Sequence, residues 1–253
     1  MVPSGLAQTF GNFTWNCTGQ GTNNYNLALS STTFNVAGTF SVLSTGTTGS
    51  LRLSGTGSYS ANVGSVVVSG GILDLQSGAS GTPSLNISGA LTQSAPGELK
   101  STATSSGNPT LHFNGTINQT VTFATQPTGP ITFRVSNPAG ITLNASFSTF
   151  TFGNGTLGGV RISTNAGTPI ALSGSLTALA YNAANSTLTY DAAATCTATS
   201  IVYPAASNPA NLTLNVGSMN ALSIPFDRTV SNTLTLTAGE INMGSYTLTL
   251  GTG

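Results

Sequence analysis

Apolar residues alternate with polar ones along nearly the whole chain, always in short runs. Alternation with a period of two predicts β-strands with one buried face. Each run is bounded by Gly, Asn, Pro or Ser, which favour turns. No segment of helical length carries a 3.6-residue period, and the Ala-rich run Leu179–Ala184 comes nearest to one. The runs include Phe34-x-Val36, Leu51-x-Leu53, Val66-x-Val68, Leu85-x-Ile87, Leu111-x-Phe113, Phe133-x-Val135, Val160-x-Ile162, Leu212-x-Leu214 and Leu234-x-Leu236.

The runs also repeat at a longer interval. Val66–Ser77 resembles Leu234–Ser245, and Pro109–Phe113 resembles Ser186–Tyr190. The equivalent positions Val36, Val63 and Ile87 lie 24 to 27 residues apart, which suits one coil of a solenoid. Repeats of this kind cannot bury a face alone and must stack. We therefore expect an all-β chain folded as a β-solenoid, with a β-sandwich array as the alternative.

The domain organisation follows from the same repeats. We expect a single continuous β-solenoid over residues 1–253, with two fused sub-blocks, about 1–105 and 106–253, as a finer division. The first five residues are neither basic nor strongly apolar, as an export signal would be. We therefore expect a mature chain or a segment of a longer protein, and no membrane-spanning segment, because no long apolar run exists.

Charged residues make up only 4% of the chain, and the net charge is zero. Nucleic-acid binding needs a basic surface that displaces counterions, so we expect no nucleic-acid partner. The absence of net charge also removes the repulsion that keeps many proteins monomeric.

Catalytic patterns are weak in this sequence. The sole histidine, His112, stands between Leu111 and Phe113, which predicts an outward-facing strand residue with Thr189 as its counterpart in the repeat. Gly153–Gly158 matches a dinucleotide fingerprint, but no helix is expected after it. The acids are far apart in sequence, which disfavours a carboxylate pair or a calcium loop. We expect no enzyme, no cofactor and no metal site. The acids are Asp74, Glu98, Asp191, Asp227 and Glu240.

The two cysteines, Cys17 and Cys196, are too few for a disulfide framework. We expect half-buried thiols, with a disulfide between subunits as the alternative.

Four segments carry a resemblance to a known family: Gln8–Gln20, Pro209–Val216, Thr233–Gly239 and Tyr246–Gly251. They resemble the β-solenoid repeat regions of very large secreted surface or adhesin-like proteins of Bacteroidetes bacteria. The first is similar to the start of their repeat units, and the other three are similar to their coils. The resemblance implies a secreted or cell-surface repeat protein of adhesin or filament type, and it says little about any ligand.

An assembly interface is our first functional hypothesis. The aromatic residues Phe10, Phe13 and Trp15 form either the core of the first coil or a surface for another subunit. We expect this segment to pair head to tail with the C-terminal strands of a second copy, which would make the chain a subunit of a filament or stalk. The C-terminal residues of that interface are Leu234, Leu236, Leu248 and Leu250.

Two further functions stay open. The first is an adhesin module that binds a glycan, or ice through a flat threonine face. The ice alternative requires the Thr-x-Thr pairs to stack in register across coils. The second is a polysaccharide-processing β-helix, for which the sequence offers no acid cluster. The threonine pairs are Thr187/Thr189, Thr195/Thr197/Thr199, Thr235/Thr237 and Thr247/Thr249.

Overall fold

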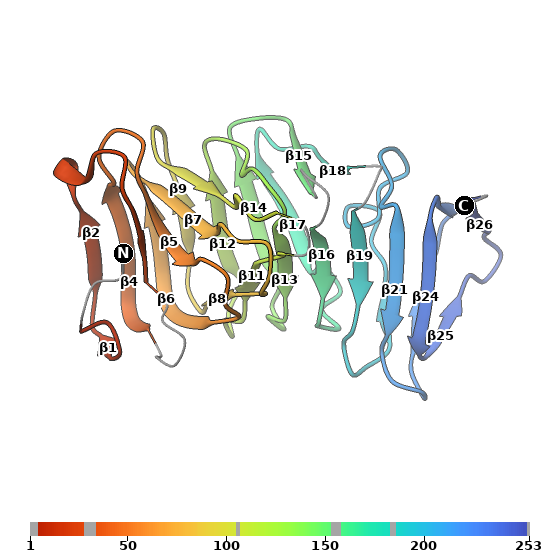
Figure 1. Ribbon diagram of the computed structural model, residues 1–253. Helices are drawn as coiled ribbons and strands as arrows, with labels where there is room; N and C mark the ends of the chain where they lie inside the picture. Colours follow the sequence, from red (N-terminus) through yellow and green to blue (C-terminus); the bar gives the residue numbers. More distant parts are fainter. Residues whose placement is uncertain (1–4, 28–33, 105–106, 153–157, 183–185, 252–253) are drawn as a thin grey trace.

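The chain forms a β-solenoid of stacked short strands. The computed structural model describes residues 5–27, 34–104, 107–152, 158–182 and 186–251. All paired strands within these ranges run parallel, and the strands stand side by side from the N-terminal to the C-terminal end (Figure 1). The one helical element among these residues is a 3₁₀ turn, η1 (Thr18–Gln20), and none of their helices is long and apolar enough to cross a membrane.

Each coil contributes strands to up to three faces of the solenoid, which we call walls. Every coil contributes one strand to the first wall, whose sheet is continuous from the first to the last coil. Its strands are β1 (Thr9–Phe10), the first half of β4 (Asn35–Ser44), the first half of β6 (Ser60–Val68), β8 (Ser84–Ile87), β11 (Thr110–Phe113), β13 (Thr132–Val135), β16 (Gly159–Ile162), β19 (Thr187–Tyr190), β21 (Asn211–Asn215) and β24 (Thr233–Ala238).

The second wall follows the first after a corner. Strands β4 and β6 continue around that corner, where the pairing shifts register between Val36 and Thr39. Its strands are β2 (Phe13–Asn16), the second halves of β4 and β6, β9 (Leu91–Gln93), β12 (Gln119–Phe123), β14 (Ile141–Ala145) and β17 (Ile170–Gly174); in the last coils this place is taken by β20 (Cys196–Thr197), β22 (Ala221–Ser223) and β25 (Glu240–Asn242).

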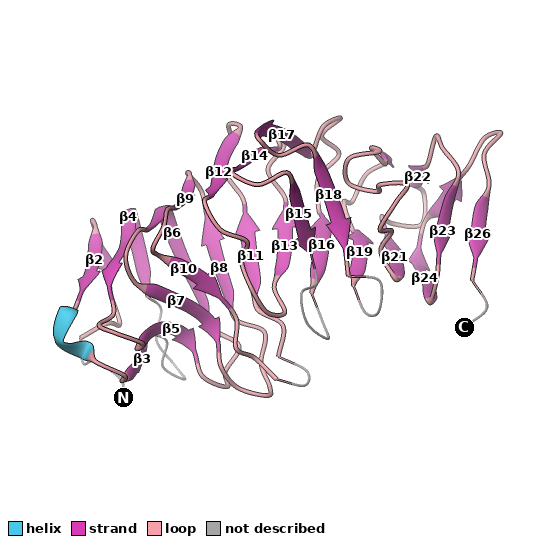
Figure 2. Cartoon of the chain, turned by 90° about the horizontal axis from the view of Figure 1, so that it is seen from above, coloured by secondary structure: helices cyan, strands magenta, loops and turns pink. Residues whose placement is uncertain are grey.

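The third wall is interrupted. It consists of three separate sheets, seen from above in Figure 2. The first contains β3 (Asn24–Asn26), β5 (Ser50–Ser54), β7 (Ile72–Gln76) and β10 (Glu98–Lys100); the second contains β15 (Thr149–Phe152) and β18 (Ala178–Tyr181); the third contains β23 (Arg228–Val230) and β26 (Leu248–Leu250).

The core consists of columns, by which we mean residues directly opposite one another on successive strands. In most strands between the two end coils, alternate residues point inward and are almost fully buried, as the period-two pattern requires. Phe133 lies at the centre of an aromatic cluster, with ring centroids 5.2 Å from Phe152, 5.3 Å from Phe150 and 6.1 Å from Phe123. Burial of such columns is the main stabilising term of a solenoid.

Buried amide side chains close the corners between walls. Gln119 is 2% exposed, and its Nε2 donates to the carbonyl oxygens of Ile87 at 2.8 Å and Gly89 at 2.7 Å. Its Oε1 accepts from the Gly115 N–H and from Asn137 Nδ2, each at 2.9 Å. Backbone groups that leave the sheet at the corner are thus paired, which buried polar groups require.

The register confirms the solenoid predicted from the sequence. Val36, Val63 and Ile87 occupy one inward column, as their spacing predicts. His112 and Thr189 share one outward column, which confirms the second proposed repeat.

The first proposed repeat is wrong as an equivalence. Val66–Val68 lies on the second wall, whereas Leu234–Leu236 lies on the first. Strands on all walls have a period of two, so a similar sequence does not show that two strands lie on the same wall. The Ala-rich run also contains a strand, β18, over its described part; Ala183 and Ala184 lie outside the described residues.

Candidate functional sites at the end coils and on the first wall

The last coil presents an open face. Strands β24, β25 and β26 each pair on one edge only among the described residues, with β21, β22 and β23. Leu236 is 56% exposed and Leu250 is 57% exposed, whereas their column neighbours Leu214 and Val230 are buried. Leu234 and Leu248 are half-buried against the core. All four leucines of the expected C-terminal interface therefore lie in this coil.

The first coil carries the aromatic residues of the expected interface. Phe10, Phe13 and Trp15 are half-buried and pack against the core. Phe13 contacts Phe34 edge to face at 5.0 Å, and the Trp15 indole N–H donates to Gln20 Oε1 at 2.8 Å. These residues thus form part of the core of the first coil and still leave part of their surface on its outer side.

The two cysteines lie in different coils and are both free thiols. Cys17 is half-buried, but Cys196 is buried beneath Leu222 and Ile241, which continue its column toward the last coil. Burial raises the pKa of Cys196 to about 11. Cys196 is therefore two strands away from the open C-terminal face, and a disulfide there would need a contact other than end-to-end stacking.

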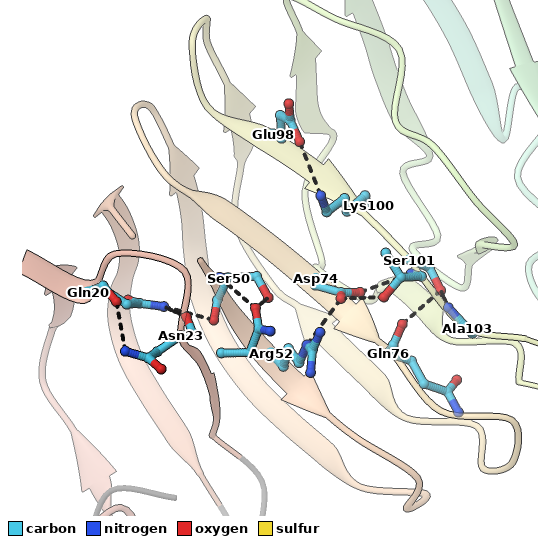
Figure 3. A network of polar contacts seen from close by, with 12 residues as sticks. Gln20, Asn23, Ser50, Arg52, Asp74, Gln76, Glu98, Lys100, Ser101 and Ala103 are labelled. Carbon is cyan, nitrogen blue, oxygen red and sulfur yellow. Dashed lines mark hydrogen bonds and ion pairs between the residues drawn. The ribbon is translucent and has the colours of Figure 1, made fainter. Parts of the chain in front are cut away.

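Charged residues gather in two places, of which the third wall is one (Figure 3). Asp74 is 1% exposed, and its carboxylate accepts from the Thr102 N–H at 3.1 Å and the Thr102 hydroxyl at 2.6 Å. Arg52 Nε lies 3.4 Å from Asp74 Oδ2, an ion pair without hydrogen-bond geometry. Burial raises the pKa of Asp74, opposed by the bonds from Thr102 and the charge of Arg52. The hydrogen bonds of Asp74 connect β7 with the segment that follows β10.

The second place is the outward face of the first wall. One outward column begins with Thr9 and amides and ends with threonines, and it holds the histidine and two arginines in the middle. Its members are Thr9, Asn35, Asn62, Asn86, His112, Arg134, Arg161, Thr189, Thr213 and Thr235.

Hydrogen bonds along this column fix the state of His112. The Asn62 backbone N–H donates to Asn35 Oδ1, which identifies that atom as the oxygen. Asn62 Nδ2 donates to the same oxygen at 3.0 Å, and Asn86 Nδ2 donates to Asn62 Oδ1 at 2.9 Å. Asn86 Oδ1 therefore faces His112 and accepts its Nδ1–H at 3.0 Å. His112 Nε2 is left to accept the Ser136 hydroxyl at 2.7 Å.

His112 is thus an outward strand residue, as the sequence predicts, but it is half-buried and bonded on both sides. Its pKa is lowered to about 4, chiefly by burial and further by the charges of Arg134 and Arg161. A base of such low pKa activates a serine poorly at neutral pH, so the Ser136–His112–Asn86 arrangement fits a structural role better than nucleophilic catalysis.

Next to His112, Arg161 pairs directly with Asp191, and Arg134 is linked to the same carboxylate through Ser163. Arg134 Nε donates to Ser163 Oγ at 2.9 Å, and the Ser163 hydroxyl donates to Asp191 Oδ1 at 2.5 Å. Arg161 Nε donates to Asp191 Oδ2 at 2.6 Å, and its Nη2 forms an ion pair with the same oxygen. The sequence analysis missed this cluster. The signal was available, because His112, Arg134 and Arg161 each occupy the middle of an apolar-x-apolar run.

Other expected features are only partly assembled. The described residues contain no group of three or more His, Cys, Asp or Glu side chains that could hold a metal. Threonines stack in register over short stretches of the first wall. Thr110 aligns with Thr132, and Thr189, Thr213 and Thr235 align from β19 onward in the column that holds Arg161. Most of Gly153–Gly158 lies outside the described residues.

Asp227 and Arg228 are neighbours in sequence, but their side chains form no ion pair with each other. Arg228 is 8% exposed, lies 3.8 Å from the Phe226 ring centroid, and donates through Nε to the Tyr203 carbonyl at 2.6 Å.

Comparison with protein-family models, curated proteins and solved structures gives no match to this chain. The functional argument therefore depends on the geometry of the chain itself, and the resemblance to Bacteroidetes repeat proteins stays a prediction.

Proposed function

We propose that the chain is a structural module of an extracellular or cell-surface filament or stalk, in which copies stack head to tail. One observation carries the proposal. Phe10 and Leu236 are the first and last members of a single inward column, and Leu236 is more than half exposed at its end. A second copy placed on the C-terminal coil would continue this column with its own Phe10.

Two physical terms favour that contact. Among the described strands, none pairs with the outer edges of β24, β25 and β26, and an open strand edge is a template for another strand. Stacking would also remove Leu236 and Leu250 from water, together with the outer surface of Phe10 and Phe13, and burial of apolar area is the dominant driving force for association.

Any parallel strand could satisfy those edges, but a second copy fits best. Its first coil presents β1, β2 and β3, which belong to the same three walls that β24, β25 and β26 continue. The net charge is zero, so copies do not repel one another. A contact between unlike ends does not close on itself and therefore propagates as a fibre.

The test compares the 253-residue chain with two lysine variants by sedimentation velocity and negative-stain electron microscopy. Leu236→Lys places a charge in the end-to-end contact, so we expect it to convert fibres into monomers. Ile117→Lys makes the same change at a residue that is 75% exposed on a lateral turn, and we expect its fibres to persist.

Two results would overturn the proposal. The first is a monodisperse monomer of the unsubstituted chain at high concentration. The second is equal loss of assembly in both variants, which would indicate lateral association instead. Circular dichroism confirms that each variant keeps its β-structure.

A further inference from the structure

The outward face of the first wall has more guanidinium groups than carboxylates. Of the two guanidinium groups there, Arg161 pairs directly with the carboxylate of Asp191, whereas Arg134 is linked to it only through the Ser163 hydroxyl. The charged groups that act on His112 are these same three, and His112 itself is neutral at pH 7. The cluster therefore carries an excess of one positive charge.

The guanidinium of Arg134 is also held in place. Its Nε is bound by Ser163, and Ser163 is bound by Asp191, so the side chain is oriented from one edge. A guanidinium fixed in this way, without a carboxylate of its own, is preorganised to bind a carboxylate or sulfate group through its remaining N–H groups. Preorganisation lowers the entropy cost of binding.

A shallow groove of about 220 Å³ lies beside this cluster. Asn86 belongs to both, because it lines the groove and accepts the bond from His112. Amide and hydroxyl groups line the groove, and such groups bind the hydroxyls of sugars. The lining side chains that carry them are Thr9, Asn35, Asn62, Asn86, Ser88 and Asn114.

We propose that the first wall, over Asn86, His112, Arg134 and Arg161, binds an acidic glycan. A carboxylate or sulfate group of the glycan would pair with Arg134, and neighbouring sugar hydroxyls would occupy the groove lined by Asn86 and Asn114. Nucleic acid fits less well, because the cluster has one excess charge and the chain as a whole has none. The lateral position leaves the site open when copies stack end to end.

The experiment measures binding of three polysaccharides, and of single-stranded DNA for comparison, by biolayer interferometry at low and at physiological salt. Polygalacturonate carries carboxylates, dextran sulfate carries sulfates, and dextran is neutral. We expect one or both of the charged polymers to bind, more weakly at higher salt, and dextran to bind much less. Which of the two binds more tightly identifies the recognised group.

Two variants with the same charge change locate the site. Arg134→Gln removes the proposed contact, so we expect its affinity for the preferred polymer to fall about tenfold, the loss expected for one charge-assisted contact. Lys100→Gln removes one positive charge from the third wall, and its affinity should stay within about twofold.

Ser163→Ala frees the Arg134 guanidinium without changing the charge, and we expect a smaller loss of affinity in the same direction. Equal effects of Arg134→Gln and Lys100→Gln would overturn the proposal, as would equal binding of dextran or tighter binding of single-stranded DNA. Thermal unfolding of each variant shows whether it is folded.

Discussion

Phe10 and Leu236 terminate the same inward column of side chains, although they are separated by nearly the whole chain. Between them, each coil contributes one apolar residue to the column. A second copy stacked on the last described coil would continue this column, which is the physical basis of the stacking that we propose.

The aromatic cluster around Phe133 should be the most sensitive part of the core. Phe133→Ala removes a buried ring that contacts aromatic rings of β11, β12 and β15, so we expect the free energy of unfolding to fall by about 3–5 kcal/mol. Phe147→Ala is the control, because Phe147 is only half-buried and its removal should lower the free energy of unfolding clearly less. Urea denaturation measures both values, and equal losses would contradict this view of the core.

The buried carboxylate of Asp74 should matter more than the exposed one of Glu98. Asp74→Ala leaves Arg52 without its anionic neighbour and removes the carboxylate that accepts the Thr102 hydroxyl, so we expect the free energy of unfolding to fall by about 3–5 kcal/mol at pH 7. Glu98→Ala breaks the exposed contact with Lys100 and should cost at most about 1 kcal/mol. A small loss for Asp74→Ala, measured by urea denaturation, would show that the pair is dispensable.

Acid should weaken the fold through His112. The pKa of His112 is about 4 in the folded protein and near 6.5 when unfolded, so the unfolded chain binds the extra proton first. The free energy of unfolding should therefore fall as the pH drops from about 6.5 toward 4. Burial and the charges of Arg134 and Arg161 disfavour the proton, and the charge of Asp191 favours it.

His112→Gln isolates this effect from other titrating groups. The variant should lose less stability than the unsubstituted chain between pH 7 and pH 4.5, as measured by urea denaturation at both values. Identical losses in the two proteins would show that His112 is not shielded from protonation.

Trypsin should cut the native chain slowly and in a defined order. All five of its target residues lie within strands. Lys100 is in β10, whose outer edge has only an isolated bridge to Thr128, so we expect the first cut after Lys100. Mass spectrometry of a time course identifies the first fragments, and an early cut after Arg134 or Arg161 would contradict the continuous first wall.

The sequence predicted the fold from one property, the alternation of apolar residues. It could identify Val36, Val63 and Ile87 as equivalent because each coil has a similar length. The comparison of similar segments wrongly aligned Val66 with Leu234, because strands on different walls have the same alternation of apolar residues. The division into sub-blocks remains a prediction, although the sheet passes through it where β8 pairs with β11.

The cluster on the first wall could not be predicted in the same way. His112, Ser136 and Asn86 are distant in sequence, and only the register of β8, β11 and β13 brings them together. Outward residues carry no periodic signal, because their neighbours in space lie one coil away. Reading the middle residue of each apolar-x-apolar run as one column would have revealed the cluster.

The most direct test of head-to-tail stacking is a crosslink between Thr9 and Thr235. In the proposed assembly, Thr235 in the last coil of one copy is followed by Thr9 in the first coil of the copy stacked on it. The two residues lie in the same outward column, about 4.8 Å apart across a strand pair. The chain carries Thr9→Cys and Thr235→Cys, with Cys17→Ser and Cys196→Ala, and is treated with a short bis-maleimide. The account predicts a ladder of covalent multimers on a denaturing gel, and none when Ile117→Cys replaces Thr235→Cys. Monomers alone, or equal ladders from both pairs, would contradict it.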